Sequence, residues 1–249
     1  MAAVGRFDRI DALRGFAMVW MTVFHFCFDL NNFGHIKQNF YSDPFWTWQR
    51  TCILSLFLFT AGFSQSIAVS QGQSWQRFWR RWLMIAGCAL LVTAGSYWMF
   101  PKTFIYFGVL HGMLVMLIVT RLTVGVGQWM WVLGAVTVMA GWMAAHFPLP
   151  PDMANQLNGK SLNWIGWVTQ KPYTEDYVPL LPWMGVMWWG AAAGAWAMRS
   201  KVQWLESPGS APSAWNGLTK LGQWSLSYYM LHQPIMIGAL MGFAWLARS

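Results

Sequence analysis

The chain has 249 residues, of which 56% are hydrophobic and only 10% are charged. A soluble domain of this size carries roughly 25% charged residues because its surface has to be wetted. The composition therefore excludes an ordinary soluble domain, and it disfavours a disordered chain. A net charge of +8 could point to nucleic acid, but the basic residues fall between apolar segments, as in membrane proteins. We expect an integral membrane protein that contacts lipid and has no nucleic-acid partner.

Apolar segments long enough to cross a bilayer recur along the chain. A span needs ~20 apolar residues, and we predict seven of them, at residues 15–33, 45–69, 82–100, 104–121, 128–147, 181–198 and 220–247. Each has to be helical, because unpaired backbone amides are not tolerated in lipid. Without internal repeats, the chain is expected to form one domain over residues 1–249. The predicted fold is an all-α polytopic transmembrane helix bundle of about seven spans, with six to eight as the range.

The lysines and arginines divide unequally between the two sides of these spans, with 10 on the side of the N-terminus and 6 on the other. The positive-inside rule then predicts a cytoplasmic N-terminus. Residues 148–180 become one long extracytoplasmic loop, rich in tryptophan, tyrosine and carboxylates. Loops of this length are often functional, and aromatic faces beside carboxylates suit a sugar or polyol. An amphipathic segment lying on the membrane is the alternative.

Ionisable side chains inside the predicted spans are candidate functional residues, because their burial in lipid costs free energy. They are His25 and Asp29 in the first span, Arg50 in the second, His111 in the fourth and His232 in the seventh. At ~1.5 Å per residue, the three histidines lie at comparable depths, about 10–17 Å from a span end. The three imidazoles, each on a different span, could therefore lie at a similar depth in the membrane.

His25 and Asp29 are four residues apart and share a helical face. A carboxylate near an imidazole raises its basicity, which is what a general base needs. Asp29 and Arg50 have similar depths, so an ion pair between them is geometrically reasonable. The alternative is that these polar groups only tie helices together and that His232 lies at a kink caused by Pro234.

The chain lacks the usual soluble binding motifs. Its three cysteines form no CxxC pair, and no HxxxH spacing occurs, so we expect neither a disulfide framework nor a metal site. No phosphate-binding glycine motif of soluble nucleotide enzymes is found.

The N-terminal block runs RIDALRGFA from Arg9 and FHFCFDL from Phe24, and further blocks lie at residues 50–62, 108–112, 179–185 and 221–234. Together these blocks resemble, in order, the membrane acyltransferases of the heparan-alpha-glucosaminide N-acetyltransferase catalytic-domain family. The likeness is greatest to the short bacterial members. The first block is the most specific, although RxDxLRG is also similar to the broader acyltransferase-3 group.

The resemblance implies a multi-pass enzyme of the bacterial inner membrane. It would move an acetyl group from cytoplasmic acetyl-CoA to an amine or hydroxyl of an extracytoplasmic sugar or glycan. The family's membrane histidine maps to His25 as general base. Larger relatives carry Asn at this point and a His some eleven residues later, which makes His35 the second candidate base.

The phosphates of acetyl-CoA cannot enter hydrocarbon, so its nucleotide is expected at the cytoplasmic face, where arginine forks suit phosphate. The expected contacts to this co-substrate are Arg9, Asp11, Arg14, Arg77, Arg80, Arg81, His232 and Gln233. The same arginines could instead be topology signals that face anionic lipid. Arg50 or His111 is expected to stabilise the oxyanion of the reaction.

Two further functions stay open at this point. One is a small-molecule or proton-coupled transporter, in which the intramembrane His and Asp residues relay protons. Transporter folds often contain paired repeats, and none is found here. The other is a structural or assembly subunit. Direct transfer and an acetyl-imidazole intermediate are both compatible with the residues, and so is a homo-oligomer.

Overall fold

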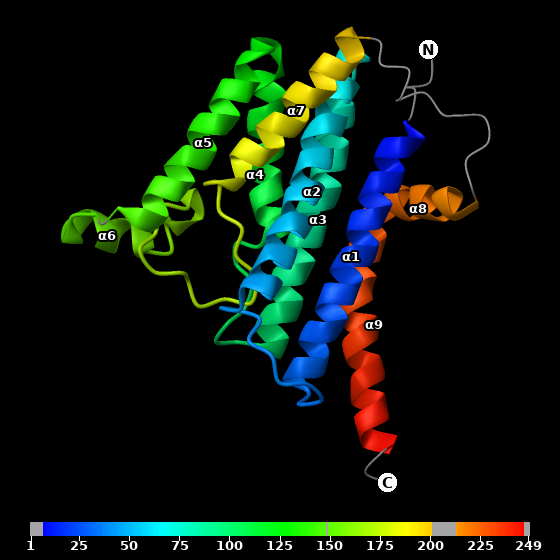
Figure 1. Cartoon of the computed structure of the whole chain (residues 1–249), viewed down its shortest axis with the longest axis vertical. Coiled ribbons are helices and arrows are strands. Elements are labelled where there is room, and N and C mark those ends of the chain that lie inside the picture. The colour runs from blue at the N-terminus through cyan, green and yellow to red at the C-terminus, as the bar shows by residue number, and fades with distance from the viewer. Residues whose placement is uncertain (1–6, 148, 201–212, 247–249) are drawn as a thin grey trace. The chain divides into compact units, whose positions relative to one another are not determined.

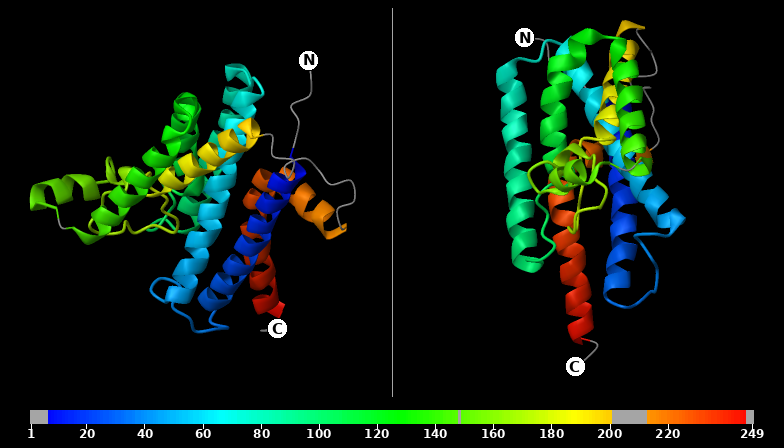
Figure 2. Two further views of the ribbon diagram at one scale, coloured as in Figure 1. Left: turned by 45° about the horizontal axis from the view of Figure 1, so that its top comes forward. Right: turned by 90° about the vertical axis from the view of Figure 1, so that its left-hand side faces the viewer.

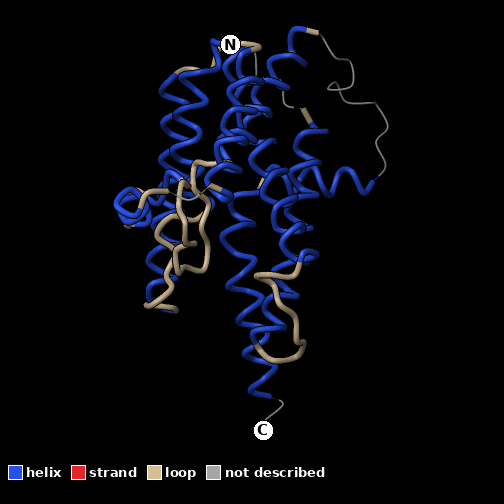
Figure 3. Tube along the Cα trace, turned by 60° about the vertical axis from the view of Figure 1, so that its left-hand side comes forward, coloured by secondary structure: helices blue, strands red, loops and turns tan. Residues whose placement is uncertain are grey.

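The computed structural model describes residues 7–147, 149–200 and 213–246 (Figure 1). Its helices are α1 (Asp8–Asn32), α2 (Pro44–Ser70), α3 (Trp75–Met99), α4 (Val109–Thr123), α5 (Trp129–His146), α6 (Pro151–Asn158), α7 (Trp183–Arg199), α8 (Ser213–Gln223) and α9 (Ser225–Leu246), with 3-10 turns at Val124–Val126 and Asn163–Ile165. Figure 3 shows helices and loops, and no strand, over the described residues. The predicted all-α fold is confirmed.

Six of the seven predicted spans each overlap one helix, and the seventh, at residues 220–247, overlaps both α8 and α9. Within the described residues, five helices are long and apolar enough to cross a membrane: α1, α2, α3, α4 with its 3-10 extension, and α5. The remaining two predicted spans correspond to α7, which has only 17 residues, and α9, which carries the polar His232 and Gln233. The apolar helices support a membrane protein. The number of spans and the cytoplasmic N-terminus remain predictions.

The helices begin where capping and charge allow, not where the apolar run begins. α1 starts at Asp8, seven residues before the predicted span, and has Asp8 and Asp11 in its first turn. Carboxylates at this end are stabilised by the helix dipole. α3 starts at Trp75 because the Ser74 side chain accepts a hydrogen bond from the Arg77 amide (3.3 Å).

The chain folds into two compact units, which are described separately. The terminal unit contains α1, α2 as far as Phe57, α8 and α9. The central unit contains α2 from Leu58 onward and α3 to α7. α2 is one continuous helix that belongs to both. The expectation of a single domain stays a prediction.

Glycines let helices of the central unit approach closely. A Cβ on Gly62 would overlap the Met187 carbonyl, and a Cβ on Gly190 would overlap the Phe59 carbonyl, so α2 and α7 are in backbone contact. Gly134 of α5 faces α7 in the same way. Small residues at helix contacts are typical of membrane proteins, because lipid supplies no hydrophobic drive for association.

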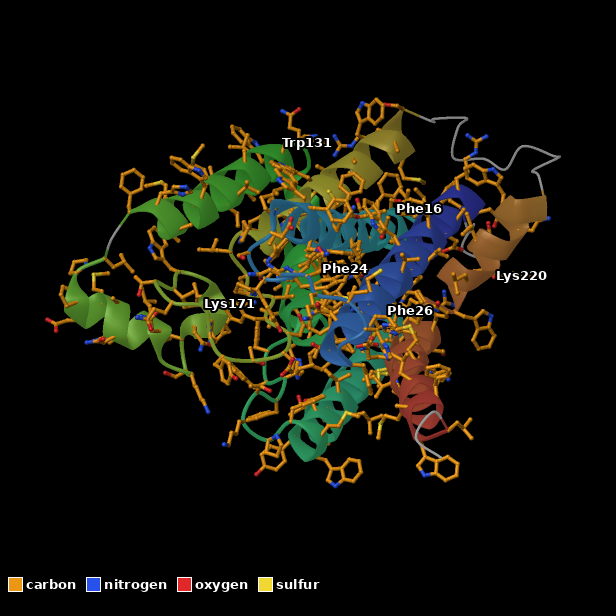
Figure 4. All side chains as sticks on the ribbon, turned by 60° about the horizontal axis from the view of Figure 1, so that its bottom comes forward. Phe16, Phe24, Phe26, Trp131, Lys171 and Lys220 are labelled. Atoms are coloured by element: carbon orange, nitrogen blue, oxygen red, sulfur yellow. The ribbon has the colours of Figure 1, made fainter. Side chains whose placement is uncertain are left out.

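One face of α1 is apolar and exposed. Phe16, Val19, Val23 and Phe26 are 48%, 41%, 57% and 45% exposed, and Figure 4 labels both phenylalanines. Their spacing of three, four and three residues places them on one helical stripe. An exposed apolar stripe of this kind suits contact with the hydrocarbon chains of lipid.

The predicted seventh span is interrupted at Trp224, so residues 213–246 form two helices. In Figures 1 and 2, α8 crosses α1 and α9 at a steep angle, while α9 runs beside α1. α8 packs closely on α1: a Cβ on Gly222 of α8 would overlap the Asp11 carbonyl, and a Cβ on Gly15 of α1 would overlap the Leu218 carbonyl. Glycine at both points holds α8 against α1.

Replacing Gly222 by Ala is expected to destabilise the protein by about 1–3 kcal/mol, because the added methyl group has no room. Gly217, also on α8, is the matched control: it is exposed and nothing lies within 4 Å of an added Cβ. Gly217→Ala should hold or raise stability by up to about 1 kcal/mol through helix propensity. The measurement is the thermal unfolding midpoint in detergent, and equal midpoints for the two variants would contradict the packing argument.

Candidate active site

The terminal unit brings two of the predicted histidines into contact. His25 on α1 and His232 on α9 have ring centroids 5.3 Å apart, with planes inclined by 59°. His25 also lies edge-on to Phe24, which is labelled in Figure 4 and itself contacts Phe40 and Trp46. The pair is thus enclosed on one side by aromatic rings from the α1–α2 connection and the start of α2.

The proton position on His232 follows from its hydrogen bond. Nδ1 lies 2.7 Å from the Tyr229 carbonyl oxygen, and a carbonyl can only accept, so Nδ1 carries the hydrogen. In the neutral ring, Nε2 therefore holds a lone pair. This atom is buried and has no hydrogen-bond partner among the described residues. The ring is a base whose tautomer is set by its own helix.

The Tyr228 ring lies parallel to His232, with centroids 5.9 Å apart and planes at 9°. Its hydroxyl is 2.7 Å from Thr22 Oγ1, and Thr22 itself donates to the Met18 carbonyl. Tyr228 is therefore the donor, which fixes the ring that supports His232. Sequence reasoning missed Tyr228 and Thr22. The spacing of four residues between Tyr228 and His232 was the available signal.

Asp29 is buried and pairs with Gln233. The Gln233 amide Nε2 donates to both carboxylate oxygens, at 2.8 and 3.1 Å, and Asp29 is only 3% exposed. The expected ion pair with Arg50 is not found among the described residues: Arg50 is exposed on α2, and the carboxylate is held by the amide of α9 instead. The Gln233 Oε1 atom is buried and has no partner among those residues.

His35, the second candidate base, lies beyond the end of α1. The His35 amide bonds to the Leu30 carbonyl (2.9 Å), and Gly34 has φ +78°. These contacts form a Schellman cap, in which a glycine in the left-handed conformation ends the helix. His35 is consequently an exposed loop residue, whereas His25 and Asp29 face α9.

The arginines expected at the nucleotide have different environments. Arg14 is buried, with Nη1 2.9 Å from Asp11 Oδ1 and 3.4 Å from the Gly222 carbonyl, so this pair connects α1 to α8. Arg9, in the same helix, is half-buried. Exposed arginines lie on the first turns of α3 in the central unit, namely Arg77, Arg80 and Arg81. The structure therefore gives Asp11 and Arg14 a contact within the fold, and their role toward acetyl-CoA remains a prediction.

His111 belongs to the central unit. The Thr93 hydroxyl donates to the Ile105 carbonyl (2.8 Å) and lies 3.0 Å from His111 Nε2. A hydroxyl has one hydrogen, so Nε2 is the donor in that contact and Nδ1 of the neutral ring holds the lone pair. Nδ1 is buried without a partner among the described residues. In this tautomer His111 offers an acceptor, not the donor that an oxyanion needs.

The carboxylates of the predicted extracytoplasmic loop bond within the central unit. Asp176 accepts the Val109 amide (2.7 Å) and caps α4, and Glu175 accepts from the Thr103 hydroxyl. Tyr177 donates to the Asn163 carbonyl, and burial, with Tyr106 nearby, raises the pKa of its phenol. The phenol stays protonated and keeps this donor role. A sugar site in this loop remains a prediction.

No group of three or more His, Cys, Asp or Glu side chains suited to a metal ion occurs in the part of the chain that the structure describes. What the terminal unit assembles is two imidazoles, a buried carboxylate and a carboxamide. Such a set can accept a proton and stabilise the resulting imidazolium.

Comparison with known proteins agrees with the sequence blocks. The family model described as "Heparan-alpha-glucosaminide N-acetyltransferase, catalytic" matches residues 6–234. No curated protein and no solved structure shows a significant match to the chain. Because the family model covers nearly the whole chain and includes both histidines of the pair, the protein belongs to the heparan-alpha-glucosaminide N-acetyltransferase catalytic family, a family of membrane acetyltransferases.

Proposed function

We propose that this protein transfers the acetyl group of cytoplasmic acetyl-CoA to an amine or hydroxyl of an extracytoplasmic sugar or glycan, and that it does so in a bacterial inner membrane. Family membership supports the reaction type. The observation that carries the proposal is the contact of His25 with His232 beside the buried Asp29–Gln233 pair. A structural subunit would have no need of a buried base.

In the proposed reaction His25 takes the proton of the acceptor as its oxygen or nitrogen attacks the thioester carbonyl. The new bond to carbon forms, the carbon–sulfur bond breaks, and CoA leaves as a thiolate that regains a proton from the imidazolium. The negative charge of Asp29, one helical turn from His25, stabilises that imidazolium. Gln233 holds the carboxylate in place through two hydrogen bonds.

Arg50 is the group that we propose for the oxyanion, because a guanidinium donates hydrogen bonds in every accessible protonation state. His111 is the weaker candidate, because its unpartnered Nδ1 carries a lone pair and cannot donate a hydrogen bond to an oxyanion. For the phosphates of acetyl-CoA we propose Arg77, Arg80 and Arg81, which are exposed on the first turns of α3, because guanidinium forks suit bidentate binding of phosphate.

The test is an assay of purified protein in detergent with acetyl-CoA and a panel of amino sugars, neutral sugars and polyols. We expect release of free CoA that depends on the acceptor, together with an acetylated product of matching mass. Release of no CoA with any acceptor, combined with proton or solute movement in vesicles, would instead favour the transporter. CoA release without an acetylated product would mean hydrolysis and would contradict transfer.

A further inference from the structure

His232 holds a buried lone pair for which the structure shows no use. Its Nδ1 hydrogen is directed to the Tyr229 carbonyl, and its Nε2 has no partner among the described residues. Nearly all buried polar atoms in proteins are hydrogen-bonded, so an exception calls for an explanation. His232 is only 8% exposed, which excludes bulk solvent as the missing partner.

The separation of the two rings matches an imidazole–imidazole hydrogen bond. An N–H···N bond of about 2.9 Å between two imidazoles puts their centres about 5 Å apart. The observed separation of the His25 and His232 centroids is 5.3 Å. At this centroid separation an N–H···N bond between a reoriented His25 ring and Nε2 needs no change in the distance between the two rings. Among the described residues His25 makes ring contacts but no side-chain hydrogen bond.

Few charged groups surround the pair. Asp29 follows on α1 and is bonded to Gln233, and α9 contributes the phenols of Tyr228 and Tyr229. The neighbouring cluster of Met18, Met21 and Ile53, against which Tyr228 and Tyr229 pack, receives apolar side chains from α2 and Leu221 from α8. Arg50, the ionisable group of α2 nearest in depth to Asp29, is exposed. The neighbouring charge therefore comes from one carboxylate, Asp29. A single negative charge favours the uptake of one extra proton by the two imidazoles together, not of two.

We propose that His25 and His232 act as one proton-sharing pair, in which the imidazolium formed at His25 donates its second N–H to Nε2 of His232. This inference rests on the proposed function. The proton comes from the acceptor hydroxyl or neutral amine and goes to the CoA thiolate, so no further reactant is needed. His232 is a positioning residue: it raises the basicity of His25 and holds its ring, and does not itself touch the substrate.

The test compares pH profiles of kcat/KM for the wild type, His232→Phe and His232→Gln. Phe keeps the stacking against Tyr228 but offers no acceptor, so the rate should fall at least tenfold and the acidic limb should move to lower pH. Gln offers an amide oxygen, a weaker acceptor, so both changes should be smaller. His146→Phe is the control for the exchange, because His146 is exposed and stacks on Trp142 in the central unit. Its profile should superimpose on that of the wild type.

An acidic limb that stays in place in folded His232→Phe would overturn the proposal, as would equal losses in the Phe and Gln variants with no shift. If the Phe variant does not fold, the acidic limb of the pH profile of His232→Gln is used instead: a shift to lower pH supports the proposal, and an unchanged position overturns it. If the wild type transfers no acetyl group at all, the proposed function is wrong, but the proton-sharing pair can still be tested. The pair is then tested by NMR of ¹⁵N-labelled histidine, where His25 must take up its proton at lower pH in His232→Phe than in the wild type.

Discussion

Replacing His25 by Ala is expected to lower acetyl transfer about 10²–10⁴-fold, the usual contribution of a general base. The variant should still insert and purify, because the side chain makes ring contacts with Phe24 and His232 and no hydrogen bond within the described structure. Its loss removes the proton acceptor and leaves the helix contacts of Met18 and Met21 untouched. Release of free CoA with the best acceptor measures the rate, and elution volume and thermal midpoint in detergent report the fold.

His35→Ala is the competing arm of the same experiment. The family resemblance leaves two candidates for the base, His25 and His35, and comparing the two Ala variants distinguishes between them. If His25 is the base, His25→Ala loses transfer and His35→Ala keeps most of it, since His35 is an exposed residue beyond the cap of α1. Full activity in His25→Ala with loss in His35→Ala would move the base to the α1–α2 loop and end the mechanism proposed above.

The extent of the helices shows what hydropathy can and cannot predict. Apolar length alone located the five helices that are long and apolar enough to cross a membrane among the described residues, because lipid forces a continuous apolar run into a helix. It missed the starts of α1 and α3, where charged turns precede the apolar run and are held by dipole and cap interactions. It also missed the break at Trp224, after which α9 begins, and the close packing of Gly222 against the Asp11 carbonyl, a tertiary contact that hydropathy does not encode.

In the candidate site too, contacts within one helix could be predicted and contacts between helices could not. The shared face of His25 and Asp29 could be predicted, because both lie on one helix at a spacing of four. The bonds from Gln233 to Asp29 join residues 204 positions apart, and they depend on the register of α9 against α1, which periodicity does not encode. The depth argument therefore chose Arg50 as partner for Asp29, when an uncharged amide occupies that place.

Replacing Asp29 by Asn tests whether the buried carboxylate acts through its charge or only through its hydrogen bonds. The variant should fold as well as the wild type. The Asn oxygen can still accept from Gln233 Nε2, and its amide can donate to Gln233 Oε1, which is buried without a partner among the described residues. Asp29→Leu is the contrasting variant: it leaves the Gln233 amide unpaired and should lower the thermal midpoint, since an unsatisfied buried donor costs about 1–3 kcal/mol.

Acetyl transfer by Asp29→Asn should nevertheless fall about 100-fold. A carboxylate and an imidazolium about 6 Å apart, one helical turn along α1, attract by about 3 kcal/mol at an effective dielectric constant near 20. That energy lowers the barrier of a step in which His25 becomes charged, and each 1.4 kcal/mol corresponds to about a factor of ten in rate. Wild-type turnover by a folded Asp29→Asn would show that the carboxylate is either uncharged or remote from the developing charge. Asp29 would then serve only to join α1 to α9 through Gln233.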